Sequence, residues 1–360
     1  MPRPIRAAIS ASALTHNFMV AKAYAGGAKV WAVLKANAYG HGLERVAKAC
    51  EGADGFAVLD FQEAARLRVA GVAKPILMLE GVFRAADVAL LTKYSLTPVI
   101  HNPEQVEMLR LSELPAEIDV YLKINTGMNR LGFTVENLRA AYNAVRMHPQ
   151  VRSVTAMTHF ADADGASGVK GQLDWFHEMT NQIEGLGQAP RSMANSAALI
   201  RFPETRGAWV RPGIILYGGS PFADRPAATL DLKPAMTLTS EIIATQHLQP
   251  GERVGYGFAY EAAGEMDLAV VACGYADGYP RHAPTGTPVL VNGKRARTVG
   301  RVSMDMLCVD VSDIPEAYIG TPVTLWGEGL PADEVAAAAG TVSYELFCAL
   351  VPRVPVGEIP

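Results

Sequence analysis

The sequence has no long apolar run and no excess of positive charge. No uncharged apolar stretch approaches the ~20 residues that a transmembrane helix needs. The formal net charge is −4, so no electrostatic attraction to nucleic acid or to an anionic membrane is expected. We therefore expect neither nucleic acid nor a membrane as partner.

Cysteine is also scarce, and its four copies are scattered along the chain. None of them forms the Cys-x-x-Cys pair that is typical of zinc sites, and the spacing does not suggest a disulfide framework. We expect reduced thiols and no metal site. The cysteines are Cys50, Cys273, Cys308 and Cys348.

The first 18 residues lack the apolar core of a signal peptide. Early arginines are present, but Ser10, Ser12, Thr15 and His16 interrupt the segment that would have to be apolar. We therefore expect an unprocessed cytoplasmic protein.

Charged residues make up 19% of the chain, below the average of roughly 25%, whereas apolar residues make up 49%. This balance indicates a globular protein with much buried surface, and it would suit an oligomer. A chain of 360 residues is long for a single core, so we expect two domains.

Up to about residue 230, short apolar runs alternate with amphipathic stretches such as 61–70, 103–111 and 135–147. Eight strands that alternate with helices over this length predict a TIM-type (β/α)₈ barrel, an α/β fold. The last two runs have the weakest strand propensity. The predicted strands are Val30–Leu34, Gly55–Leu59, Ile76–Leu79, Leu96–Ile100, Val120–Ile124, Val154–Thr158, Arg191–Ala194 and Trp209–Arg211.

Beyond residue 232 the pattern changes to alternation of apolar and polar residues with a period of two, which predicts a mostly β domain. Asn292-Gly293 is a strong signal for a tight hairpin between two such runs. Helices are expected at 332–339 and 344–350. We therefore divide the chain into a barrel domain, residues 1–232, and a C-terminal β domain, residues 233–360.

Reactive residues of such barrels lie at the C-terminal ends of the strands. Lys35 follows the first predicted strand, Arg130 the fifth and His159 the sixth. Ser196 and Arg211-Pro212-Gly213-Ile214 follow the last two, where barrels of this kind often bind phosphate. An amine, two arginines and a phosphate site suit a phosphorylated carbonyl cofactor held as a Schiff base.

Each of these signals also has a simpler structural explanation. Lys35 could anchor an ion pair, and Ser196 could belong to a helix N-terminus. The Arg-Pro-Gly segment could be an ordinary turn, and His159 could be a hydrogen-bonded structural histidine. Only their joint placement at one end of the barrel favours a site.

Seven segments resemble signature sequences of the alanine racemase family, fold-type-III pyridoxal-phosphate enzymes. They are "LKANAYGHG", "LKINTGMNRLG", "ANSAA", "RPGIILYG", "VGYGFAY", "GYADGYPR" and "GRVSMDM", and they occur in the family's order. Together with Tyr344 they span nearly the whole chain from Lys35 onward. "KANAYGHG" and "GYADGYPR" are the most specific of them.

The resemblance implies that Lys35 holds pyridoxal 5'-phosphate as a Schiff base and that Arg211 faces the pyridine nitrogen. An arginine stays protonated at neutral pH, so the ring nitrogen would remain unprotonated, which disfavours transamination. The residues implied to hold the cofactor are Lys35, Tyr39, Ser196, Arg211, Gly213, Ile214 and Tyr344.

By the same resemblance Tyr256 is the second catalytic base, acting on L-alanine while Lys35 acts on D-alanine. An unperturbed tyrosine pKa of about 10 is too high for this task, so His159 and Arg211 would have to favour the phenolate. In the family Tyr256 would come from the second subunit of a homodimer. Its alternative role is to pack in a hairpin between glycines.

The resemblance assigns the substrate carboxylate to Arg130 and to the backbone N–H of Met304. Tyr275, Arg281, Arg301 and Tyr344 would line the entrance to the site. Lys123 matches a lysine that is carbamylated in family members, and an unmodified strand-edge lysine is the alternative.

The sequence departs from the family pattern at three places. Ser303 replaces a common cysteine, Asn129 replaces a common glycine, and the ending "LVPRVPVGEIP" lacks an arginine and an aromatic residue of the usual pattern. The last difference puts C-terminal contacts near the dimer interface in doubt.

Several alternatives stay open at this point. A broader-specificity racemase or a decarboxylase would keep the cofactor, although Arg211 argues against the decarboxylase. A non-catalytic pyridoxal-phosphate-binding protein would not need Tyr256, and a cofactor-free aldolase would leave the phosphate site without a purpose. An alanine racemase could supply D-alanine for peptidoglycan or act in alanine catabolism.

Overall fold

The computed structural model describes residues 3–359 and contains a closed barrel of eight parallel strands. The strands follow one another around the barrel in chain order, and the last, β9, pairs with the first, β2. This confirms the predicted barrel. Its strands are β2 (Lys29–Val33), β3 (Gly55–Val58), β4 (Ile76–Met78), β5 (Leu96–Ile100), β6 (Ile118–Lys123), β7 (Val151–Met157), β8 (Arg191–Ser192) and β9 (Trp209–Val210).

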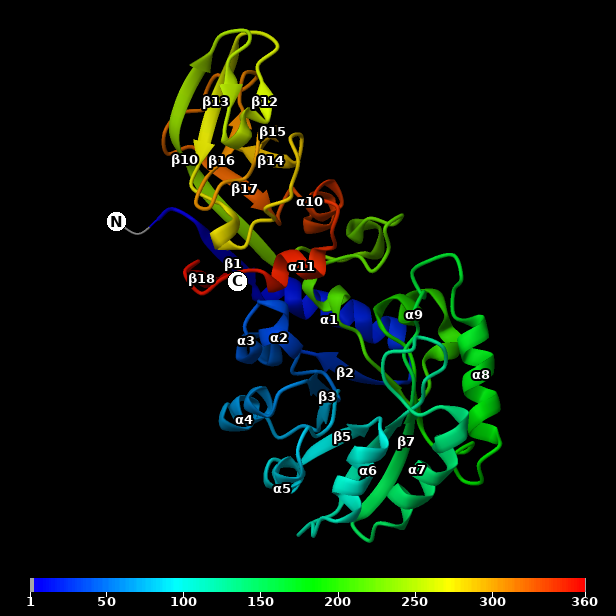
Figure 1. Cartoon of the computed structure of the whole chain (residues 1–360). Helices are drawn as coiled ribbons and strands as arrows, with labels where there is room; N and C mark the ends of the chain where they lie inside the picture. The colour runs from blue at the N-terminus through cyan, green and yellow to red at the C-terminus, as the bar shows by residue number, and fades with distance from the viewer. Residues whose placement is uncertain (1–2, 360) are drawn as a thin grey trace.

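The barrel strands β3, β4 and β5 are mostly apolar because both of their faces are covered. Every residue of β3, β4 and β5 is buried. Helices lie around the outside of the barrel, α1 before its first strand and the others between successive strands (Figure 1). They are α1 (Ala11–Ala25), α2 (Lys35–Tyr39), α3 (Leu43–Ala49), α4 (Phe61–Val69), α5 (Val88–Lys93), α6 (Pro103–Arg110), α7 (Val135–Met147), α8 (Lys170–Asn181) and α9 (Ser196–Arg201).

Local sequence fixes where these helices begin. The side chain of Asp60 caps α4 by accepting a hydrogen bond from Gln62 N, and Asn102 caps α6 in the same way at Gln105 N. At the start of α7, the Asn137 side chain accepts from Thr134 N, which is one half of a capping box. The three helices predicted in this part of the chain agree with α4, α6 and α7 to within one residue at either end.

The C-terminal part forms an eight-stranded sheet in the order β13-β16-β15-β14-β17-β10-β1-β18. All neighbours are antiparallel except β1 and β18. The predicted hairpin joins β14 to β15, where Asn292 and Gly293 both have positive φ. The strands are β10 (Met236–Leu248), β13 (Met266–Val271), β14 (Pro288–Val291), β15 (Lys294–Val299), β16 (Leu307–Asp310), β17 (Pro322–Trp326) and β18 (Val356–Ile359), with β11 (Arg253–Val254) and β12 (Tyr260–Glu261) as a separate pair.

Strand β1 (Arg6–Ser10) lies near the N-terminus of the chain but belongs to the C-terminal sheet. It pairs with β10 on one side and with β18 on the other. The sequence did not predict this strand. The division at residue 232 stays a prediction, with the qualification that the first strand crosses it.

Two short helices complete the C-terminal part, α10 (Ala332–Ala338) and α11 (Ser343–Cys348). Figure 1 shows α11 between the sheet and the barrel, next to α1 and α2. The contact with the turn after α2 is close, because a Cβ added at Gly40 would lie 2.2 Å from the Phe347 carbonyl oxygen. Within residues 3–359, no helix is long and apolar enough to cross a membrane.

Candidate active site

Lys35 stands two residues beyond the end of β2 and begins an unusual turn. The four residues that follow it, 36 to 39, all have φ between 51° and 56°, although none is glycine. A left-handed conformation costs an ordinary residue about 1–2 kcal/mol, and such strain is typical of functional sites. The turn is held by hydrogen bonds from Asn37 N to Glu63 Oε1, 2.8 Å, and from Leu43 N to Asn37 Oδ1, 3.1 Å. The surrounding structure therefore fixes the backbone next to Lys35.

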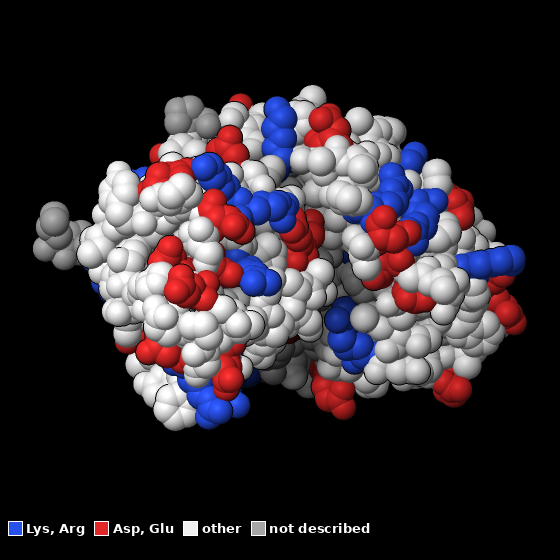
Figure 2. All heavy atoms as spheres, turned by 90° about the horizontal axis from the view of Figure 1, so that it is seen from above, with Lys and Arg blue, Asp and Glu red and all other residues white. Residues whose placement is uncertain are grey.

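Lys35 lies in a cluster of positively charged groups at the top of the barrel. Its pKa is lowered, first by burial and then by Arg130. Burial, with Arg211 and Arg130, also lowers the pKa of Lys123 to about 8. A lowered pKa gives Lys35 a larger share of the neutral amine that condenses with a carbonyl. The remaining positive charge favours an anionic ligand, whereas on the face shown in Figure 2 basic and acidic side chains are interspersed.

Arg211 is buried, and both of its terminal nitrogens are hydrogen-bonded. Its guanidinium donates to Ser192 Oγ at 2.7 Å and to the carbonyl oxygens of Thr158 and Met193 at 2.7 and 3.1 Å. Burial lowers its pKa to about 10, which still leaves it protonated at neutral pH. Arg211 Nη2 also lies 3.5 Å from His159 Nδ1.

His159 is held neutral. Burial lowers its pKa well below the usual value, and Arg211 adds to the effect. Because a guanidinium can only donate, Nδ1 is the acceptor of this contact and the ring proton is assigned to Nε2. His159 can therefore pass the influence of the Arg211 charge to a group beyond Nε2.

The side chains of Tyr39 and Ser196 meet at Gly213. The Gly213 N–H donates to Ser196 Oγ at 2.9 Å, which leaves the serine hydroxyl proton available to another acceptor. A Cβ at position 213 would lie 2.8 Å from the Tyr39 hydroxyl oxygen. The Tyr344 ring approaches the Tyr39 ring at 5.9 Å.

The backbone adds a further donor to this cradle. Ile214 is buried, yet its N–H donates to no acceptor within residues 3–359. Buried N–H groups are nearly always paired, so this one indicates an external acceptor. Hydroxyl groups, a spare N–H and nearby positive charge fit the phosphate of a cofactor.

Arg130 stands in the loop after β6. Asn125 Oδ1 accepts from Gly127 N and Asn129 N, both at 3.1 Å, and Asn129 adopts the positive φ for which glycine is common. The exposed Arg130 guanidinium forms no hydrogen bond or ion pair with another residue of the described chain. It is therefore available to a ligand.

A second group of predicted site residues lies in the β domain. Tyr256 is 68% exposed and begins a short 3₁₀ turn, Tyr256–Phe258, between β11 and β12. Arg301 lies next to this turn, since a Cβ at Gly257 would be 3.0 Å from Arg301 Nη1. The Arg281 guanidinium lies over the Tyr275 ring, 5.9 Å from its centre.

One chain does not bring the two groups together. Within residues 3–359 no contact joins Tyr256 to Lys35, and Figure 1 shows β12 at the far end of the β domain from β2. Met304, Tyr275, Arg281 and Arg301 also belong to the β domain; among the predicted C-terminal site residues, only Tyr344 reaches the barrel group. A site made of both groups requires a second chain.

Some site residues were missed by sequence reasoning. Glu80 lies near Lys35 and Lys123 and raises the pKa of both, against the larger lowering effects. It follows β4 closely, so the rule that found Lys35 could have found it. Tyr217 stacks on Tyr39 at 4.6 Å and donates to the Val33 carbonyl at 2.7 Å. Its position in the segment "RPGIILYG" was the only sequence signal for it.

Comparisons with known proteins cover both parts of the chain. Residues 9–221 match the family model "Alanine racemase, N-terminal domain", and residues 235–357 match "Alanine racemase, C-terminal domain". The chain is 53% identical over 357 residues to alanine racemase from Paraburkholderia phytofirmans, covering 99% of both. It is also 53% identical over 358 residues to alanine racemase from Nitrosomonas eutropha, covering 99% of both.

Solved structures give the same result. The crystal structure of biosynthetic alanine racemase from Pseudomonas aeruginosa superposes with a TM-score of 0.95 at 46% identity, covering 99% of this chain and all of that one. The enzyme from Enterococcus faecalis superposes with a TM-score of 0.88 at 36% identity, covering 99% and 98%. The chain therefore belongs to the alanine racemase family.

Proposed function

We propose that this chain interconverts L-alanine and D-alanine with two bases, Lys35 and Tyr256, on opposite faces of the substrate. Family membership makes it an isomerase that depends on pyridoxal 5'-phosphate. The observation that carries the two-base proposal is the position of Tyr256: an exposed tyrosine between glycines, in a domain that places it away from its own Lys35. Tyr256 then acts in the site of a second subunit, and the enzyme is a homodimer.

Pyridoxal phosphate, when bound, acidifies the Cα–H of an attached amino acid by withdrawing electrons. In this proposal the Lys35 amine holds it, and Tyr39, Ser196, Gly213, Ile214 and Tyr344 hold its phosphate. The spare serine proton and the unpaired Ile214 N–H support that assignment.

Arg211 faces the ring nitrogen in the same proposal. A protonated ring nitrogen would need a hydrogen-bond acceptor opposite it. The Arg211 guanidinium stays protonated and can only donate, so the ring nitrogen stays unprotonated. Electron withdrawal is thereby limited, which suits an enzyme that removes one proton and replaces it.

Arg130 and the Met304 N–H bind the substrate carboxylate. Arg130 provides charge-assisted hydrogen bonds, and Met304 provides a backbone donor that no described group accepts from. Tyr275, Arg281, Arg301 and Tyr344 line the entrance and restrict it to small amino acids. Carbamylation of Lys123 would place an anion beside Arg130 and orient it; the lowered pKa supports this step, because CO₂ reacts with the neutral amine.

The two bases move the proton at Cα. Lys35 takes it from D-alanine and the Tyr256 hydroxyl returns a proton on the opposite face; in the reverse direction the Tyr256 phenolate takes it from L-alanine and the Lys35 ammonium returns one. His159 donates from Nε2 to the phenolate and carries the effect of Arg211 through Nδ1, which lowers the cost of the charged tyrosine.

The purified protein, loaded with pyridoxal phosphate, should racemise alanine in both directions and other amino acids far more slowly. Chiral chromatography across an amino-acid panel measures this. Similar rates on many amino acids would favour the broad-specificity racemase, and a bound cofactor without turnover would favour the non-catalytic binding protein.

A cytoplasmic location and the supply of D-alanine for peptidoglycan belong to the same proposal. The relative from Pseudomonas aeruginosa is described as biosynthetic, which supports that role. A deletion strain that needs added D-alanine would support it too, whereas failure to grow on alanine alone would indicate catabolism.

Replacing Gly213 by alanine should raise the Kd for pyridoxal phosphate by at least about tenfold, because the new Cβ would lie 2.8 Å from the Tyr39 hydroxyl oxygen. Absorbance titration of the apoenzyme measures the change. Gly264→Ala is the matched control, since a Cβ there meets nothing within 4 Å. An unchanged Kd in Gly213→Ala would remove Gly213 from the phosphate site.

A further inference from the structure

Two loops of the β domain are joined backbone to backbone. The loop that begins after β13 donates from Tyr275 N to Ser303 O at 3.0 Å and from Ala276 N to Met304 O at 2.9 Å. Gly274 permits this approach, because a Cβ there would lie 2.4 Å from both of the accepting carbonyl oxygens. The position of the Met304 peptide therefore depends on the loop that contains Tyr275.

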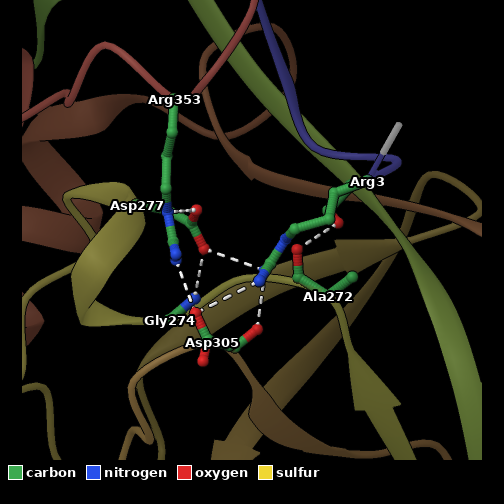
Figure 3. A network of polar contacts seen from close by, with 7 residues as sticks. Arg3, Ala272, Gly274, Asp277, Asp305 and Arg353 are labelled. Carbon is green, nitrogen blue, oxygen red and sulfur yellow. Dashed lines mark hydrogen bonds and ion pairs between the residues drawn. The ribbon is translucent and has the colours of Figure 1, made fainter.

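The two loops are also tied by an ionic network that comes from both ends of the chain (Figure 3). Arg353 Nε donates to Asp277 Oδ1 at 2.8 Å, and its Nη2 donates to Asp305 Oδ1 at 2.7 Å. Arg3 bridges the same two residues, with its Nη2 at 3.1 Å from Asp277 Oδ2 and its Nη1 at 3.2 Å from Asp305 Oδ1. Arg3 Nη2 also donates to the Asp305 carbonyl oxygen at 2.7 Å.

Asp277 makes this network more than a surface feature. Its side chain is fully buried, and Oδ2 also accepts from Gly274 N at 2.9 Å. Exposed ion pairs usually contribute little, but a buried carboxylate that loses its partners forces its surroundings to rearrange. Loss of Arg353 would therefore be transmitted to Gly274 and, through the paired backbones, to Met304.

We propose that Arg353 and Arg3 are positioning residues for substrate binding. They hold the 303–304 peptide so that the Met304 N–H, which donates to no group within residues 3–359, points at the substrate carboxylate. This inference rests on the proposed role of Met304. It assigns a function to the one arginine, Arg353, that the atypical C-terminal segment keeps.

Arg353→Gln should raise the KM for alanine by about tenfold and change kcat less than about twofold. The reason is that the hydrogen bond from the Met304 N–H to the substrate carboxylate is lost equally from the ground state and the transition state. The Kd of propionate, which is alanine without its amine, should rise by about the same factor in calorimetry on the holoenzyme. Arg353→Lys keeps the charge but cannot bridge both carboxylates, so it should recover only part of the effect. Arg3→Gln, which loses only the outer bridge, should raise KM by about threefold.

Arg297→Gln is the matched control. Arg297 pairs with Asp310 at 3.1 Å in the same sheet but touches neither loop, so KM and the propionate Kd should not change. A lower melting temperature in Arg353→Gln and Arg3→Gln, with KM and the propionate Kd unchanged, would reduce the network to a structural one and overturn the inference. If Arg353→Gln does not fold, Arg3→Gln and Arg353→Lys decide by the same two measurements. Failure of the wild type to racemise alanine would instead reject the proposed function itself.

Discussion

Tyr256→Phe should lower the racemisation rate in both directions by about 10³-fold or more while the cofactor stays bound. The change removes one hydroxyl from a side chain that is 68% exposed in the single chain, so neither folding nor the cradle around Gly213 should suffer. Chiral assay of activity and the absorbance spectrum of the bound cofactor measure the two effects separately.

Exchange of the Cα hydrogen with D₂O tests the two bases separately in the same variant. Lys35 remains in Tyr256→Phe, so D-alanine should still exchange its Cα hydrogen slowly with D₂O, whereas L-alanine should not. Tyr318→Phe is the matched control, because Tyr318 is a 67% exposed tyrosine outside the proposed site. Equal exchange of both enantiomers in Tyr256→Phe would contradict the assignment of one base to each face.

Lys35→Ala should reduce activity at least about 10⁴-fold, since it removes both the cofactor attachment and the base for D-alanine. The visible band of the attached cofactor should disappear, although the cradle around Ser196 and Gly213 should still bind free pyridoxal phosphate non-covalently. Added methylamine should restore part of the activity by replacing the missing amine.

Lys48→Ala is the control for this change, because Lys48 is an exposed lysine on α3. Retention of the visible band in Lys35→Ala, with borohydride fixing the cofactor to another lysine, would show that Lys35 is not the attachment site.

The barrel could be predicted because its strands carry their own signal. Buried parallel strands such as β3 and β4 are continuously apolar, and the intervening helices have capping residues such as Asp60 and Asn102. Strands β8 and β9 are only two residues long, and the strand propensity of their sequences is correspondingly low. They were predicted from the alternation of apolar runs with helical stretches, and they were the weakest of the eight predicted strands.

Strand β1 could not be predicted to join the C-terminal sheet. Its partners β10 and β18 are more than 200 residues away in the chain, and nothing local distinguishes this pairing from an edge of the barrel. The β14–β15 hairpin is the opposite case, since the turn residues Asn292 and Gly293 specify it locally.

The site also contains residues that the sequence could predict and residues that it could not. Lys35 and the residues after the last barrel strands could be placed because a barrel brings strand ends together. The left-handed turn at residues 36–39 could not, because it contains no glycine and depends on Glu63 from another helix. The network of Arg3 and Arg353 depends on both chain ends meeting at Asp277, which only the folded sheet shows.

Mixing the two inactive variants tests the central claim most directly. A dimer of one Lys35→Ala chain and one Tyr256→Phe chain contains one site with both changes and one site with an intact Lys35 and an intact Tyr256. After random exchange of equal amounts, half of the dimers are mixed, so activity should recover to about a quarter of the wild-type value. If subunit exchange is demonstrated by tagged chains and no activity returns, each site belongs to a single chain and the account is contradicted.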